Sequence, residues 1–355
     1  MQTFFVYILT FAIVVAMSKK AQKKGKRIFM ILAAFVLSAI AGLRAVTVGL
    51  DSANYADLFE HIANGRLDLA YGLETSFKYI CAALLFIWNN PNFLFFVFAL
   101  ITNILILLRL WDFREQIALP WATAVYLGMF YFMTFNAMRQ FVAVAIVFYA
   151  SRYLLDKKYI RFCIYVLIAS LFHRSAIVGI ALIACDVFAW KYLDAWQKKL
   201  LKAFIIIGPI VIVVFGSAII GRYAIYLNNV KFNFGLMLFL KLFLFMLTSL
   251  FLRGEYLSEG DNNECSVQSY SLTTAKTYYC LGILITMLGY FFPFVERIGL
   301  YFYLFETVYV GKLMKSDHIE AIIKFFIAIL YLVLLAMSLM GNGQGQGDYL
   351  FFWQI

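Results

Sequence analysis

Charged residues are scarce in this chain: they make up 14% of its 355 residues, whereas hydrophobic residues make up 64%. In a soluble globular protein, about a quarter of the residues are charged and about half are apolar. The composition therefore excludes a soluble globular protein and indicates a polytopic membrane protein. The sequence also lacks the alternation of apolar and polar residues that a transmembrane barrel requires, so we expect helical spans.

Cysteine and histidine are also too few and too scattered for a disulfide framework or a metal site. The five cysteines form no CxxC pair, and an odd number leaves at least one unpaired, so we expect them to be packing residues. None of the three histidines has metal-ligand spacing such as HExxH, so we expect no metal ion. A net charge of +11 would suggest nucleic acid in a soluble domain, but in a membrane protein its distribution among the loops reports topology. We therefore expect no nucleic acid partner.

Apolar runs of about 16 to 22 residues are long enough to cross a bilayer core of ~30 Å. The first has no positive residue before it and a lysine cluster after it, the reverse of a cleavable signal peptide, so we expect it to remain as a span. We predict an all-α protein with about twelve transmembrane helices in a single integral membrane domain over residues 1–355. The runs are residues 3–17, 28–43, 91–108, 119–134, 137–154, 159–172, 175–190, 203–221, 233–252, 277–293, 297–311 and 321–340.

Residues 76–88 form a further apolar stretch that is too short for a confident span. Whether this stretch crosses the membrane decides which side of the membrane each later loop faces. We expect an interfacial or re-entrant helix, because the lysine-rich segments then face the cytoplasm, as the positive-inside rule requires. Residues 44–75 become an extracytoplasmic loop and residues 253–276 a cytoplasmic loop. The basic residues predicted to be cytoplasmic lie in residues 19–27, 109–114, 156–161, 191–202, 253–276 and 312–315.

The cations that remain on the outer side are mostly arginine, whose planar guanidinium suits bidentate recognition of phosphate. Arg139, Arg174 and Arg297 each begin a predicted span whose N-terminus points outward, where free N–H groups and the helix dipole favour an anion. With Arg44 as a fourth member, they predict a site for a diphosphate. The alternative is that each arginine snorkels to the interface or pairs with a neighbouring carboxylate.

Three other side chains on this side are candidates for acid–base work. His173 directly precedes Arg174, and a neutral imidazole there would accept a proton from a sugar hydroxyl. Asp51 and Glu296 are the best placed outer carboxylates, with Glu74 and Asp57 as weaker candidates. Alternatively, His173 is structural, Asp51 forms a turn after a glycine, and Glu296 neutralises its neighbour.

Aromatic residues on the same side are candidates for stacking on sugar rings. They are Tyr55, Trp88 and Tyr301, and an aromatic belt at the membrane interface is the alternative for each.

Lys241 lies near the middle of a predicted span, where a charge usually faces a cavity or a partner. The C-terminal stretch GNGQGQGDYLFFWQI is rich in glycine but does not stand between a strand and a helix, so a phosphate-binding loop is not predicted.

Three short motifs follow one another along the chain: Arg44 with Val48-Gly49-Leu50-Asp51-Ser52 and Tyr55, then Arg139-Gln140-Phe141-Val142-Ala143, then Phe172-His173-Arg174-Ser175-Ala176. In this succession the sequence resembles the EpsG/Wzy-like polysaccharide polymerases of bacterial surface-glycan pathways. The resemblance implies an inner-membrane glycosyltransferase with a helical fold related to the C-type glycosyltransferases, without nucleotide sugar, metal or other cofactor. It also implies a substrate made of undecaprenyl-diphosphate-linked oligosaccharide repeat units.

The resemblance implies roles for the residues of these motifs. The growing chain would move from its lipid diphosphate to the non-reducing end of the next lipid-linked unit, outside the membrane. Arg139 and Arg174, with Arg44 and Arg297, would hold the diphosphate leaving group, and His173 or else Asp51 would activate the acceptor hydroxyl. Glu296 is the third candidate for acid–base work. The candidate substrate-binding residues are Tyr55, Gln140, Ser175 and Tyr301.

The partners expected for such a protein are membrane lipids, the lipid-linked glycan, a flippase and a chain-length regulator. A transporter of lipid-linked sugars is an alternative function, but it would place several ionisable residues at mid-membrane between repeated halves, and only Lys241 is that deep. An O-antigen ligase-like enzyme or a membrane O-acyltransferase are alternatives among enzymes. The ligase-like enzymes normally have a larger outer loop than residues 44–77.

Overall fold

The computed structural model describes residues 2–66, 74–187, 267–288, 293–317 and 319–354. Within these ranges the secondary structure is helical, and the only β-type pairing is an isolated bridge between Arg44 and Phe351. The prediction of an all-α protein is therefore confirmed. The chain divides into two compact units, Met1–Ile177 with Glu306–Ile355, and Val178–Phe305.

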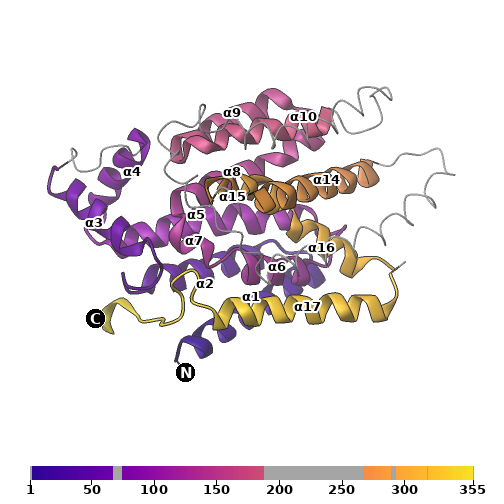
Figure 1. The fold of residues 1–355 in the computed structure, drawn as a ribbon, viewed down its shortest axis with the longest axis horizontal. Coiled ribbons are helices and arrows are strands. Elements are labelled where there is room, and N and C mark those ends of the chain that lie inside the picture. The colour runs from indigo at the N-terminus through magenta and orange to yellow at the C-terminus, as the bar shows by residue number, and fades with distance from the viewer. Residues whose placement is uncertain (1, 67–73, 188–266, 289–292, 318, 355) are drawn as a thin grey trace. The chain divides into compact units, whose positions relative to one another are not determined.

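The first unit contains most of the described helices (Figure 1). They are α1 (Gln2–Lys24), α2 (Ile28–Leu43), α3 (Ser52–Ala63), α4 (Thr75–Leu85), α5 (Pro91–Asp112), α6 (Leu119–Met129), α7 (Met133–Asn136), α8 (Met138–Leu155), α9 (Tyr159–Phe172), α16 (Glu306–Lys315), α17 (Ala321–Met340) and the 3₁₀ turn η3 (Phe352–Gln354). The 3₁₀ helix η1 (Arg174–Ile180) crosses into the second unit, which contains α10 (Ala181–Val187), α14 (Val267–Leu288) and α15 (Pro293–Tyr303).

Four of the described helices, α1, α5, α8 and α17, are long and apolar enough to cross a membrane, and α2 and α9 are shorter apolar helices. The expected runs 203–221 and 233–252 lie outside the described residues, so the number of about twelve spans stays a prediction. Three expected runs are not single α-helices. The described part of residues 175–190 divides into η1 and α10. Residues 119–134 divide into α6 and α7, and residues 297–311 contain the end of α15 and the start of α16.

The break between α6 and α7 has its cause in side-chain packing. At the turn, the Tyr131 hydroxyl donates to the carbonyl oxygen of Leu37 at 2.7 Å, and Phe132 lies edge-on to Tyr7 with ring centroids 4.7 Å apart. These contacts bury aromatic side chains between neighbouring helices. Hydropathy registers the burial and not the turn, which is why the sequence suggested one uninterrupted helix.

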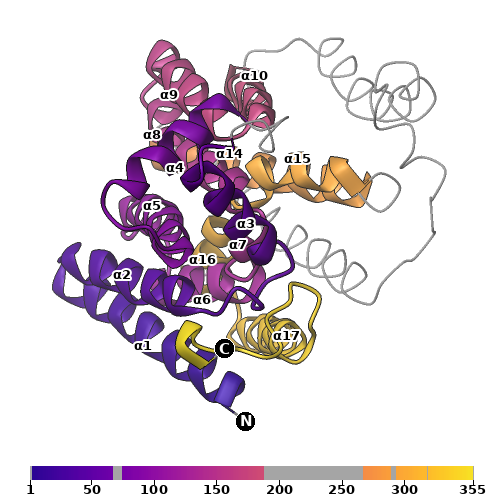
Figure 2. The same ribbon diagram turned by 90° about the vertical axis from the view of Figure 1, so that its left-hand side faces the viewer.

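Helices α2 and α5 run antiparallel, and this arrangement determines where the segment between them lies. The Asn103 amide donates to the Ser38 hydroxyl at 3.2 Å near the middle of both helices. Towards the end of α2 and the start of α5, the Asn92 amide donates to the carbonyls of Gly42 at 2.6 Å and Arg44 at 2.7 Å. The connection that includes α3 and α4 therefore starts and finishes at the same end of the first unit, drawn on the left in Figure 1 and facing the viewer in Figure 2.

The C-terminal segment, residues 341–354, returns to this end and covers the loop after α2. The Ala45 amide donates to the Leu350 carbonyl at 2.8 Å, and the Gly49 amide donates to the Gly345 carbonyl at 2.9 Å. Both glycines have positive φ, +98° and +70°, and a Cβ on Gly345 would lie 2.8 Å from the Leu50 amide nitrogen. The close approach of these two backbones therefore requires glycine at residue 345.

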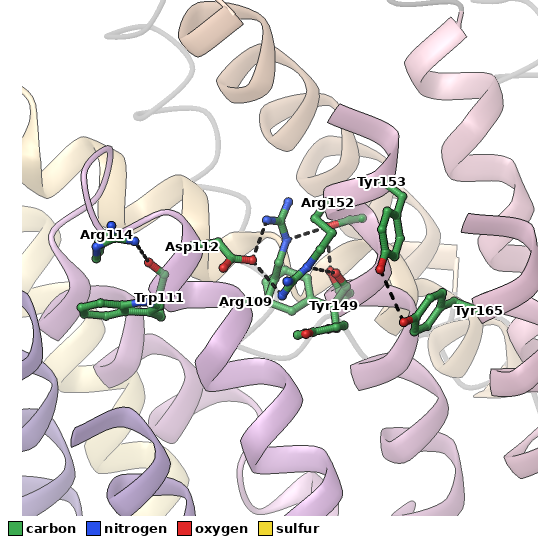
Figure 3. A network of polar contacts seen from close by, with 10 residues as sticks. Arg109, Trp111, Asp112, Arg114, Tyr149, Arg152, Tyr153 and Tyr165 are labelled. Carbon is green, nitrogen blue, oxygen red and sulfur yellow. Dashed lines mark hydrogen bonds and ion pairs between the residues drawn. The ribbon is translucent and has the colours of Figure 1, made fainter. Parts of the chain in front are cut away.

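The opposite end of the first unit carries most of its lysines. Gln22 near the end of α1 donates to the Ile117 carbonyl at 2.8 Å, and Lys315 at the end of α16 donates to the carbonyl of Glu115. Figure 3 shows the polar network that joins α5 to α8 here. The Asp112 carboxylate accepts from Arg109 at 3.2 Å and from Arg152 at 2.9 Å.

This end, which includes residues 19–27, 109–117, 156–161 and 312–315, is called the lysine end below. The end with α3 and α4 is called the arginine end. The first unit thus brings four of the segments predicted to be cytoplasmic to one end and separates them from the loop 44–75. The non-spanning position of residues 76–88 and the membrane orientation stay predictions, and this separation is consistent with both.

Helix α8 is the central helix of the first unit. In its most apolar window 72% of the residues are buried, against 17% in α17, and every residue from Phe141 to Phe148 is buried. Side chains at the start of α8 are therefore held on a firmly packed helix. A binding site benefits from such support because its geometry is fixed before a ligand arrives.

Candidate functional site

Arg139 is the second residue of α8 and lies at the arginine end. Its Nη1 atom forms an ion pair with the carboxylate of Glu74, the residue just before α4. Its guanidinium lies 5.2 Å from the ring centroid of Phe77, in the first turn of α4. Nε of Arg139 is buried and has no hydrogen-bond partner among the residues that the structure describes. The Arg139 side chain is thus held by contacts with Glu74 and Phe77, and among the described residues its Nε–H group has no acceptor.

The Glu74 carboxylate joins two segments. One oxygen, Oε2, binds Arg139, and the other, Oε1, accepts a hydrogen bond from the backbone N–H of Arg174 at 3.2 Å. The Ser76 hydroxyl donates to the carbonyl of Leu171 in the last turn of α9. The first turn of α4 is therefore attached both to the start of α8 and to the junction between α9 and η1.

His173 is the residue at which α9 ends, with an extended backbone. Its Nδ1 atom lies 2.6 Å from the Ser175 hydroxyl oxygen and accepts a weaker bond from the Ser175 amide at 3.4 Å. With Nδ1 as an acceptor, the neutral ring carries its proton on Nε2. Ser175, expected to bind substrate, is thus in contact with His173 and orients its ring.

Arg174 follows, and its side chain is exposed. Its guanidinium has no hydrogen bond or ion pair among the described residues; the backbone N–H, not the side chain, meets Glu74. The α-helix expected to begin here is instead the seven-residue 3₁₀ helix η1. It opens with a bond from the Ala176 amide to the His173 carbonyl at 2.9 Å.

Glu74, Arg139, His173, Arg174 and Ser175 form what we call the Arg139 cluster. The members come from three segments of the chain and meet at the arginine end, where α3, α4 and α7 lie in front of helices seen end-on (Figure 2). Arg139 pairs with a neighbouring carboxylate, as the alternative to a diphosphate site describes, and its role in binding a diphosphate stays a prediction.

Arg44 is placed differently from its expected role. Its side chain is only 1% exposed, and its guanidinium lies between the rings of Phe95 and Phe135, 4.2 and 4.5 Å from their centroids. The guanidinium nitrogens donate to the Ser52 hydroxyl at 3.2 and 3.3 Å and to the Val48 carbonyl at 3.2 Å. Carbonyls of Ala41 and Phe135 accept as well. Burial lowers the pKa of Arg44 to about 10, so the group stays cationic near neutral pH.

These contacts fix the loop after α2 rather than offering the Arg44 guanidinium to a ligand. The reason is that the loop turns its carbonyls inward, and a buried guanidinium supplies the donors that they need. Within the first unit, the side chains of Arg139 and Arg174 are therefore more open to a ligand than that of Arg44.

The other candidates of the first unit lie at the arginine end with different exposure. Asp51 directly precedes α3, is half-buried, and its amide donates to the Asn136 side chain at 3.4 Å. Tyr55 and Gln140 are 8% and 2% exposed, so both lie beneath the surface. Trp88 is 54% exposed. Asp57 is also exposed, on α3.

In the second unit, Arg297 is exposed on α15 and Tyr301 is buried, with 1% of its surface exposed. The side chain of Glu296 and all of Lys241 lie outside the described residues. Packing between α14 and α15 is close: a Cβ on Gly282 would lie 2.5 Å from the backbone of Tyr303. Whether Arg297 joins the arginines of the first unit stays a prediction.

Sequence reasoning missed two parts of this site. The sequence pattern favours Asp51 and Glu296 over Glu74, although a carboxylate directly before a short apolar helix, among outer arginines, is a usable signal. The second missed part is the packing of the C-terminal segment against α7, which no sequence pattern indicates. The Asn136 amide donates to the Gln344 side chain at 2.6 Å and to the Gln344 backbone carbonyl at 3.0 Å. Among the described residues, no group of three or more His, Cys, Asp or Glu side chains is placed to hold a metal ion.

A family model described as the EpsG family matches residues 27–352, which is most of the chain. No curated protein and no solved structure matches the chain.

Proposed function

The chain belongs to the EpsG family, which indicates a membrane enzyme of the polysaccharide polymerase type, and we propose that it joins lipid-linked oligosaccharide repeat units into longer chains. In this proposal the growing glycan is carried on undecaprenyl diphosphate. It is transferred to the non-reducing end of the next lipid-linked unit at the outer face of the bacterial inner membrane.

The observation that carries the proposal is the Arg139 cluster itself. It brings the Arg139 guanidinium, from the start of α8, and the His173 imidazole with the Arg174 guanidinium, from the junction of α9 and η1, to one end of the first unit. Guanidinium and backbone N–H groups are the donors best suited to a phosphate, and positive charge placed where a leaving group becomes negative lowers the barrier to transfer.

The chemistry assigns a task to each group. The acceptor hydroxyl oxygen attacks the anomeric carbon, the bond between that carbon and the diphosphate oxygen breaks, and the diphosphate leaves with the electron pair. Arg139 and Arg174 stabilise this charge. The proton of the acceptor hydroxyl passes to Nδ1 of His173 once the Ser175 hydroxyl turns away, with Asp51 as the alternative base.

The proposed orientation is supported by the distribution of charge over the first unit. Lysine near anionic lipid is the usual mark of a cytoplasmic face, so the lysine end is assigned to the cytoplasm and the arginine end to the outside. A lipid-linked substrate delivered by a flippase would then arrive at the arginine end. A chain-length regulator would also act there.

The test is polymerisation by the purified protein. The protein is given a lipid-diphosphate repeat unit, and the products are separated as a ladder of chain lengths. We expect Arg139→Ala, Arg174→Ala and His173→Ala to lose the ladder while remaining folded. Arg66→Ala is the matched control, since Arg66 is an exposed arginine of the loop 44–75 and lies outside the cluster. Normal ladders from all three cluster variants would refute the site assignment.

A further inference from the structure

The Glu74 carboxylate accepts hydrogen bonds from donors of the Arg139 cluster that are suited to binding an anion. Each of its oxygens meets a different donor, the Arg139 guanidinium for one and the Arg174 backbone N–H for the other. A phosphate group presents two oxygens to a guanidinium and an N–H in the same manner. The carboxylate thus stands where a phosphate oxygen pair of the substrate would be bound.

The pair is also exposed enough to be exchanged. The side chains of Arg139 and Glu74 are 17% and 12% exposed, so the pair lies at the edge of the surface. Glu74 directly precedes α4, and its carboxylate ends a flexible side chain, which moves without unfolding that helix. A diphosphate carries more negative charge than one carboxylate and would also meet the exposed Arg174 guanidinium, which Glu74 does not contact.

We propose that Glu74 is an internal competitor of the substrate: its carboxylate fills part of the diphosphate site in the ligand-free protein, is displaced by a lipid diphosphate, and returns when the spent lipid diphosphate leaves. This inference rests on the proposed function, because it assigns the Arg139 cluster to diphosphate binding. It adds to that function a residue, Glu74, that sets the affinity for the lipid diphosphate and the rate at which the spent lipid diphosphate is released. A competing carboxylate discriminates against anions with too little charge to displace it, and its return opposes retention of the spent lipid diphosphate.

Binding of inorganic pyrophosphate to the purified protein tests the inference, with isothermal titration calorimetry as the readout. Glu74→Gln keeps the size of the side chain and removes its charge. Because a partly exposed ion pair contributes modestly, we expect pyrophosphate to bind Glu74→Gln about two- to fivefold more tightly than the unchanged protein. Glu60→Gln is the matched control, since Glu60 is an exposed glutamate of α3 outside the cluster, and the pyrophosphate affinity of this variant is expected to be unchanged.

A role for Glu74 in merely orienting Arg139 predicts the opposite result. In that case Glu74→Gln would release the guanidinium and weaken pyrophosphate binding. Unchanged or weaker binding by Glu74→Gln would therefore overturn the inference. Adding Arg139→Ala to Glu74→Gln is expected to abolish the gain, because the guanidinium that the competitor covers is then missing.

A second measurement uses the unchanged protein and does not depend on the folding of a variant. Carbodiimide modification of Glu74, followed by mass spectrometry, reports how accessible the carboxylate is. Added pyrophosphate is expected to increase its modification, since the carboxylate is displaced into solvent. A decrease or no change would contradict displacement.

The two proposals fail in different ways. Tighter pyrophosphate binding by Glu74→Gln, combined with no ladder from the unchanged protein, supports the competitor at an anion site and contradicts polymerisation. A normal ladder with no gain in affinity supports polymerisation and overturns the role of Glu74.

Discussion

At the scale of single residues, the arginines of the first unit fall into two kinds that the sequence alone does not separate. Arg44 is enclosed by two aromatic rings and by carbonyl and hydroxyl acceptors, whereas Arg174 extends its side chain into solvent. Arg139 is intermediate: its side chain is 17% exposed and forms an ion pair with a carboxylate. The same side chain therefore stabilises a loop in one place and is available to a ligand in another.

Replacing Arg44 should affect folding rather than chemistry. Arg44→Ala leaves the inward carbonyls of the loop without a donor, and we expect the free energy of unfolding to fall by about 2–4 kcal/mol. Thermal unfolding in detergent checks this, with Arg66→Ala as an exposed arginine control. An Arg44→Ala protein that unfolds at the temperature of the unchanged protein but makes no ladder would instead place Arg44 in the reaction.

Replacing Arg174 should affect chemistry rather than folding. A lysine in its place keeps the charge but loses the planar fork, so we expect Arg174→Lys to polymerise at least about tenfold more slowly at an unchanged unfolding temperature. The initial rate of ladder formation measures this. An undiminished rate in Arg174→Lys would support interfacial snorkelling as the whole role of the side chain.

Some residues of the Arg139 cluster can be recognised from the sequence, whereas the role of Glu74 cannot. His173, Arg174 and Arg139 were recognisable because each carries a polar group at the mouth of an apolar run. The role of Glu74 depends on contacts with residues 65 and 100 positions further along the chain. Such pairing is set by how α4 packs, which no local pattern encodes.

At the scale of elements, the helix starts and ends follow the hydropathy closely where a helix is isolated by polar loops. The runs 28–43 and 321–340 coincide with α2 and α17. Hydropathy failed at residues 119–134, where the chain turns inside an apolar run to bury Tyr131 and Phe132. It also gave no indication that the glycine-rich C-terminal segment is an ordered part of the arginine end.

The C-terminal segment offers a direct test of that order. Gly345 has a φ of +70° and a Cβ there would meet backbone atoms of residues 49 and 50 at 2.8–3.0 Å, so Gly345→Ala should push the segment away from the loop. We expect a loss of about 1–3 kcal/mol in the free energy of unfolding and faster proteolysis of the loop after α2.

Gly343 supplies the matched control for this substitution, since a Cβ there would meet no atom within 4 Å. Gly343→Ala should therefore leave both stability and proteolysis unchanged. If Gly345→Ala behaved like Gly343→Ala, the C-terminal segment would not be packed on the loop as described.

At the scale of the whole molecule, the first unit separates two kinds of positive charge. Lysines collect at one end, beside the network of Arg109, Asp112 and Arg152, and the Arg139 cluster lies at the other. The sequence predicted this sorting from loop order and the positive-inside rule. It could not predict which arginines meet, because that depends on tertiary packing between α4, α8 and α9.

The proposed function requires that the Arg139 cluster faces the outside of the cell, and cysteine labelling tests this orientation most directly. In a variant without the native cysteines, Arg174→Cys reports the arginine end and Arg161→Cys, an exposed residue of α9, reports the lysine end. Intact cells, or spheroplasts where an outer membrane is present, are treated with a membrane-impermeant maleimide. An outward-facing Arg139 cluster predicts immediate labelling at residue 174, and labelling at residue 161 only after the membrane is permeabilised. Labelling at residue 161 from outside, with residue 174 protected until permeabilisation, would contradict it.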